Sequence, residues 1–147
     1  MLFRSLLVVF SAITLLFGCA SQETSKQRQA EDDQARNYLA DSKANTVVSC
    51  RNRQLCDKAF MLTKVYVQEK SDMKIQHSDE TMIATFNPIS YKSVGISALK
   101  IPGSGESATI ELKVFCKGME SSEFWDCAYK VGRINFDFKP YVESKLR

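Results

Sequence analysis

Histidine is almost absent from this sequence, and neither sign of charge is in large excess. The 147 residues hold one histidine, His77, and 20 basic against 17 acidic residues, a net charge of +3. A nucleophile–base pair usually needs a histidine oriented by a third group, and His77 has Ser78 and Asp79 beside it only in sequence. The basic residues are dispersed among acids, without the basic face typical of nucleic-acid binding. We expect no catalytic residues, no enzymatic activity and no nucleic-acid partner.

Patterns that bind cofactors or metals are also lacking. The glycines of Gly103-Ser104-Gly105 are followed neither by Lys-Ser/Thr nor by a helix start, so they indicate a hairpin turn and not a phosphate loop. The acidic pairs Asp32-Asp33 and Asp79-Glu80 fall in a polar segment and a turn, whereas a glycosidase needs two carboxylates across a cleft. We therefore expect no cofactor and no metal site.

Long apolar runs are lacking everywhere except at the N-terminus. Ten of the twelve residues from Leu6 to Phe17 are apolar, and Arg4 precedes them. The stretch from Leu6 to Ala20 is fifteen residues long, shorter than the roughly 20 that a spanning helix needs. This layout is typical of a secretory signal.

The end of this run, Leu16-Phe17-Gly18-Cys19, resembles the lipobox of bacterial lipoprotein precursors. The resemblance implies acylation of the Cys19 thiol and cleavage before Cys19, which becomes the first residue. Because Ala20 is not aspartate, it also implies an outer-membrane location facing the periplasm. Lipidation makes the membrane a partner through Cys19. The alternative is an ordinary signal peptide cut near Ala20 or Ser21, which leaves the protein in the same compartment.

Composition divides the chain into three parts. Residues 1–18 are the expected signal peptide. Residues 19–44 form a lipidated N-terminus and polar tether, because Tyr38 and Leu39 are the only large apolar residues between 20 and 44. The tether is rich in helix formers, so a frayed helix is compatible with it. Residues 45–147 are long enough for one domain.

Four cysteines remain after Cys19: Cys50, Cys56, Cys116 and Cys127. An even number in an oxidising compartment predicts two disulfides, and the spacings do not suit zinc. Reactive thiols are the alternative. Short loops favour pairing within each neighbouring pair, while bonds between the pairs would link the first helix to the sheet.

Periodicity predicts an α+β domain. Apolar residues recur at three and four positions from Leu55 to Lys70, which indicates a helix. Period-two alternation indicates strands, most clearly from Ala108 to Cys116. Residues 117–133 are expected to be a loop, and Asp137 is expected to cap a helix from Phe138 to Leu146. The other strands are expected at 73–77, 81–86 and from Val94.

These elements predict a four-stranded antiparallel sheet, with an N-terminal and a C-terminal helix on one face and disulfides joining the parts. The other face is expected to be partly exposed to solvent. Its residues Thr109, Glu111, Lys113 and Phe115 are a candidate partner surface, with an ordinary solvated face as the alternative. We therefore expect a non-catalytic, membrane-anchored periplasmic lipoprotein that serves as an accessory or interaction module of an envelope assembly. The alternatives are a periplasmic inhibitor or ligand-binding lipoprotein and, less favoured, a thiol enzyme.

Overall fold

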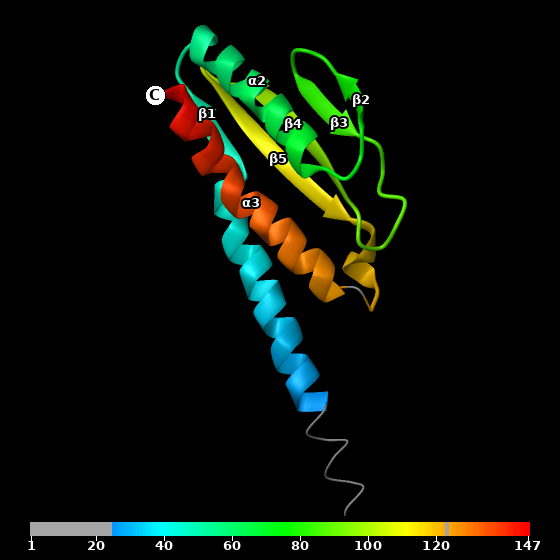
Figure 1. Ribbon diagram of the computed structural model, residues 1–147. Coiled ribbons are helices and arrows are strands. Elements are labelled where there is room, and N and C mark those ends of the chain that lie inside the picture. Colours follow the sequence, from blue (N-terminus) through cyan, green and yellow to red (C-terminus); the bar gives the residue numbers. More distant parts are fainter. Residues whose placement is uncertain (1–24, 123) are drawn as a thin grey trace, which may run out of the picture. The chain divides into compact units, whose positions relative to one another are not determined.

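The computed structural model describes residues 25–122 and 124–147 (Figure 1). The chain divides into two units, Met1–Gln34 and Ala35–Arg147. In the first unit, residues 25–34 are helical and mostly exposed. In the second unit, residues 35–42 are helical and pass through a short 3-10 turn, η1 (Lys43–Asn45), into the sheet. This second unit is called the domain.

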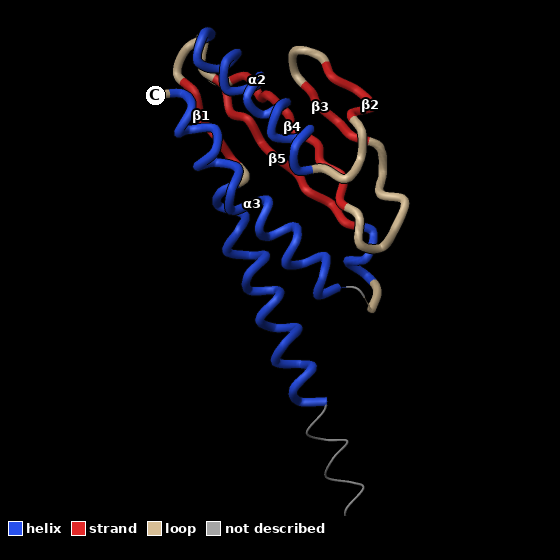
Figure 2. Tube along the Cα trace, viewed as in Figure 1, coloured by secondary structure: helices blue, strands red, loops and turns tan. Residues whose placement is uncertain are grey.

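A five-stranded antiparallel sheet forms one layer of the domain, in the order β1-β5-β4-β3-β2 (Figure 2). The strands are β1 (Val47–Cys50), β2 (Ile75–Ser78), β3 (Met82–Thr85), β4 (Val94–Pro102) and β5 (Ala108–Cys116). The prediction of an antiparallel sheet is confirmed, but the number of strands was wrong by one. The missed strand is β1, whose four residues are too few for an alternation to stand out from the polar segment before them.

The β4–β5 hairpin is the longest pairing in the sheet and runs from Val94 opposite Cys116 to Pro102 opposite Ala108. Its turn closes with a hydrogen bond from the amide of Gly103 to the carbonyl of Ser107. Gly105 has a φ of 64°, a left-handed conformation that glycine adopts without steric cost. The hairpin turn expected at Gly103-Ser104-Gly105 is thus present.

Helix α2 (Arg53–Lys70) begins at Asn52, whose side chain accepts a hydrogen bond from the amide of Leu55. This cap satisfies one of the amides that a helix start leaves without a partner. The buried residues are those of the predicted stripe: Cys56, Ala59, Phe60, Thr63, Tyr66 and Val67. The helix expected from Leu55 to Lys70 is confirmed and is two residues longer at its start.

Helix α3 (Phe124–Leu146) follows a 3-10 turn, η2 (Lys117–Glu120). The predicted loop over 117–133 was therefore wrong, and so was a helix start capped by Asp137. One buried stripe runs through the whole helix, from Ala128 through Val131 to Val142, and packing of this stripe stabilises the first three turns. Pro140 lies inside the helix and not in its first turn, so it costs one intrahelical hydrogen bond.

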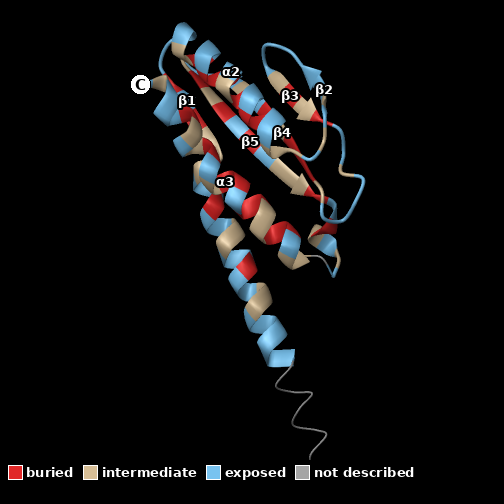
Figure 3. Cartoon of the chain, viewed as in Figure 1, coloured by how far each residue is buried: buried red, intermediate tan, exposed pale blue. Residues whose placement is uncertain are grey.

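Helices α2 and α3 lie side by side on one face of the sheet (Figure 1). Buried residues gather where the helices cover the strands (Figure 3). The hydroxyl of Tyr66 on α2 donates to the carbonyl of Ile134 on α3, and burial, followed by the nearby Asp137 and Tyr141, raises the pKa of Tyr66. The fully buried side chains at the centre are Val48, Ile83, Val94, Ile96, Ile110 and Phe138.

Candidate interaction surface

The face of the sheet opposite α2 and α3 is here called the open face. The register places Glu111 of β5 between Val47 of β1 and Leu99 of β4, with Met82 of β3 beyond Leu99. The next row pairs Ile101 with Thr109, and Leu99 and Ile101 are 45% and 40% exposed. Strand residues alternate between faces, so the open face carries partly exposed apolar side chains among polar ones.

Polar and aromatic residues lie next to Leu99 and Ile101, toward the C-terminal end of β5. Lys113 lies opposite Ser97, and Phe115 lies opposite Gly95. A Cβ atom at Gly95 would stand 2.5 Å from the ring of Phe115, so the ring lies across the backbone of β4 and requires glycine there. The alternation expected for Thr109, Glu111, Lys113 and Phe115 is present, and these residues share the open face.

The four cysteines of the domain form two disulfides. Cys50 of β1 is bonded to Cys56 of α2, and Cys116 of β5 is bonded to Cys127 of α3. These are the two local pairings, and each of them joins a strand to a helix. The cysteines are buried, on the side of the sheet that the helices cover. All four thiols are thus oxidised and serve to hold the helices on the sheet.

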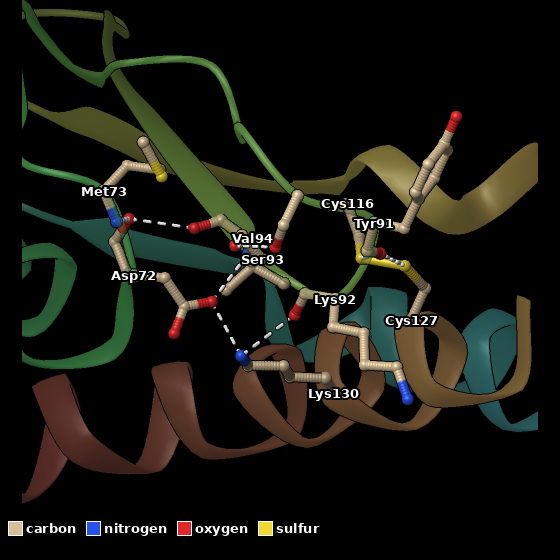
Figure 4. A network of polar contacts seen from close by, with 11 residues as sticks. Asp72, Met73, Tyr91, Lys92, Ser93, Val94, Cys116, Cys127 and Lys130 are labelled. Carbon is tan, nitrogen blue, oxygen red and sulfur yellow. Dashed lines mark hydrogen bonds and ion pairs between the residues drawn. A yellow bond between two sulfur atoms is a disulfide. The ribbon is translucent and has the colours of Figure 1, made fainter. Parts of the chain in front are cut away.

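A polar network lies to one side of the second disulfide (Figure 4). The carboxylate of Asp72 accepts hydrogen bonds from Lys130 of α3 at 2.6 Å and from the amide of Val94 at 2.7 Å. Burial raises the pKa of Asp72, but these hydrogen bonds outweigh burial and hold the pKa below its ordinary value. The network therefore ties the segment after α2 and the start of β4 to α3.

The carbonyl oxygen of Tyr91 lies 3.3 Å and 3.2 Å from the sulfurs of Cys116 and Cys127 (Figure 4). A disulfide carries no S–H, so this contact is not a hydrogen bond. It shows that the loop before β4 packs directly on the disulfide. The ring of Tyr91 lies under the ammonium of Lys117, 5.2 Å from the ring centroid.

His77 and Asp79 meet in the turn between β2 and β3. His77 Nε2 lies 2.9 Å from one oxygen of Asp79, and the other oxygen accepts from the amides of Thr81 and Met82. The amide of Thr81, then His77 and the amide of Met82, lower the pKa of Asp79. Both side chains are about half exposed, and Ser78 has no contact with the pair among the hydrogen bonds described for residues 25–122. Asp79 therefore organises a turn.

A row of aromatic rings was missed by the sequence analysis. Tyr38 packs on Tyr129 and on Phe136, and Tyr129 stacks on Trp125, with each pair of ring centroids 5.1 Å apart. We call these four residues the aromatic row. It joins the helical segment 35–42, expected as tether, to α3. No periodicity of one segment could have revealed it, because Tyr38 and α3 lie at opposite ends of the domain sequence.

Several expectations concern residues beyond this surface. Cys19 and the rest of the lipobox lie outside the described residues. Asp32 and Asp33 lie in the helical residues 25–34. Over the described residues, no helix has the length and apolar character to cross a bilayer, and no cluster of three or more metal-binding side chains occurs.

Comparison with known proteins gave no match, whether to family models, to curated proteins or to solved structures.

Proposed function

We propose that this chain is a lipid-anchored protein of a bacterial envelope, held in the outer membrane through acyl chains on Cys19 and facing the periplasm. Its domain serves as a non-catalytic interaction module that binds an envelope protein through the open face. The lipobox-like end of the apolar run supports the anchor. Two buried disulfides suit an oxidising compartment.

The binding role is supported by the exposed apolar residues of the open face. Leu99 and Ile101 are 45% and 40% exposed, although Val94, Ile96 and Ala98 on the other face of the same strand are buried. Glu111 and Lys113 lie beside them on β5 with opposite charges. The partner that fits is a protein whose contact surface has an apolar centre bordered by one basic and one acidic group.

The anchor is tested by the intact mass of protein extracted from membranes, alkylated with and without prior reduction. The expected mass is that of a triacylated chain beginning at Cys19, with alkyl groups added only after reduction. A mass without lipid would contradict the anchor. Label on unreduced protein would favour the thiol-enzyme alternative, which needs a thiol outside the two disulfides.

The binding role is tested by a photo-crosslinking amino acid placed at Leu99 or Ile101 in living cells. Met61 on α2 is the matched control, because its side chain is 70% exposed and lies away from the open face. One adduct of the same mass from both open-face positions, absent from the Met61 control and lost in Glu111→Lys, is the expected result. Equal adducts at all three positions would mean non-specific contact and contradict the proposal.

A further inference from the structure

The aromatic row lies at the surface of the domain, where its first helical segment, residues 35–42, contacts α3. Each of its four residues is half-buried, so each is in contact with both protein and solvent. Tyr38 belongs to the helical segment 35–42, and the other three rings belong to α3. The spacings of four and seven residues keep Trp125, Tyr129 and Phe136 on one side of α3.

Basic side chains border the row. Tyr38 and Tyr129 line an open hollow of about 490 Å³ together with Lys92, Lys130 and Arg133, and Asp126 is the one acid in the lining. Lys92 pairs with Asp126 at 2.8 Å, and Lys130 pairs with Asp72 at 2.6 Å. Arg133 is exposed and has no ion pair among the described residues, so the hollow keeps a positive charge.

A second cation lies close to the same side. The guanidinium of Arg36 sits 4.8 Å from the centroid of the Phe124 ring, at the start of α3. Phe124 directly precedes Trp125, so Arg36 adds positive charge beside the aromatic row. Tryptophan and tyrosine accompanied by arginine and lysine are the residues enriched where proteins meet phospholipid headgroups.

The position of the row in the chain brings it near the lipid. Tyr38 is nineteen residues after Cys19, and the domain begins at Ala35, sixteen residues after Cys19. Sixteen residues span at most about 55 Å when extended and about 24 Å when helical. A short tether gives the bilayer a high effective concentration around the domain, so a surface with modest affinity suffices.

From these observations we infer that the aromatic row and the hollow beside it rest on phospholipid headgroups of the membrane that holds Cys19. The tyrosine and tryptophan rings lie at the level of the headgroups, and Arg133 binds lipid phosphate. The domain therefore lies on the bilayer in a fixed orientation. This inference rests on the lipid anchor of the proposed function.

Trp125 provides the test, because it is the only tryptophan in the chain. The full lipidated protein is placed in vesicles of phosphatidylethanolamine and phosphatidylglycerol, and its attachment is checked by flotation. Fluorescence of Trp125 is then measured with brominated and with ordinary phospholipid, since bromine quenches only at close range. The expected result is quenching by brominated lipid that increases with the phosphatidylglycerol fraction.

Arg133→Glu is expected to lower this quenching at least about twofold, since it reverses a charge that faces anionic lipid. Lys113→Glu is the matched control: it makes the same charge change on the open face and is expected to leave quenching unchanged. Protein that floats with the vesicles while Trp125 is not quenched would overturn the inference and leave the anchor intact. Protein that does not float would contradict the anchor itself.

Discussion

The two faces of the sheet differ in what their apolar residues do. On the covered face, Val48, Ile96 and Ile110 are fully buried beneath α2 and α3. On the open face, Leu99 and Ile101 of β4 remain exposed on the same strand as Ile96. Similar side chains therefore contribute mainly to stability on one face and are available for contact with a partner on the other.

The disulfides follow the same division. Each joins a strand to a helix on the covered side, Cys50 to Cys56 for α2 and Cys116 to Cys127 for α3. The open face has no covalent link to another element among residues 35–122 and 124–147. A partner can therefore bind the open face without disturbing the interactions that hold the domain together.

The largest effect is expected from Ile96→Ala. Ile96 is fully buried on the covered face, so truncation removes buried methyl groups and leaves a cavity, at a cost of about 2–5 kcal/mol in the free energy of unfolding. Ile101→Ala is the matched control on the same strand and is expected to cost less than about 1 kcal/mol. Denaturant unfolding of both variants measures the difference. Equal costs would mean that the open face is covered in solution and would break the comparison.

Strong periodicity made part of this arrangement predictable. The alternation in β5 separates Ile110 and Leu112 from Glu111 and Lys113, and the stripe of α2 is continuous from Cys56 to Val67, about three helical turns. Each signal lies within a single segment, so it can be detected in the sequence without knowing which other segments that segment contacts. The open face follows from the same alternation.

The elements that were missed depend on contacts between distant segments. Strand β1 is only four residues long and is stabilised by pairing with β5, from Val47 opposite Glu111 to Cys50 opposite Ala108. The first half of α3 contains Gly132, an unfavourable residue in a helix, and its packing is completed by Tyr38. Tertiary contacts override local preference at both places, and the aromatic row was missed for the same reason.

Removing the disulfides tests whether they stabilise the covered face. The cysteines are six residues apart in the Cys50–Cys56 pair and eleven apart in the Cys116–Cys127 pair. Loop-closure entropy predicts losses of about 2 kcal/mol for Cys50→Ala/Cys56→Ala and about 3 kcal/mol for Cys116→Ala/Cys127→Ala. Thermal and urea unfolding of the two double variants measure these losses. Crosslinking from Leu99 is expected to survive in any variant that stays folded, and its loss would show that the two faces are coupled.

Gly132→Ala tests the packing of the helical segment 35–42 on α3. A Cβ atom at position 132 would stand 2.3 Å from the ring of Tyr38, so the ring must move. We expect a loss of about 1–3 kcal/mol in the free energy of unfolding. Tyr38→Ala removes the obstructing ring, so the double variant is expected to lose less than the sum of the single variants, with a coupling of about 0.5–3 kcal/mol. Strict additivity would mean that Tyr38 does not pack on Gly132 in solution.

The smallest effect is expected from Asp72→Asn, which removes the charge that connects the segment after α2 to Lys130. The folded pKa of Asp72 is below its ordinary value, so its contribution is complete above the unfolded pKa of about 3.9 and is lost as pH falls through the folded pKa. The side chain is 39% exposed, so solvent screening limits the contribution to less than about 1 kcal/mol. Unfolding measured from pH 7 down to pH 2 is therefore expected to show a shallower acid loss for Asp72→Asn than for the unmodified protein. Ile101 carries no titrating group, so the control Ile101→Ala is expected to lose stability with falling pH as the unmodified protein does. Parallel curves of unfolding free energy against pH for Asp72→Asn and the unmodified protein would contradict the role of the Asp72–Lys130 ion pair.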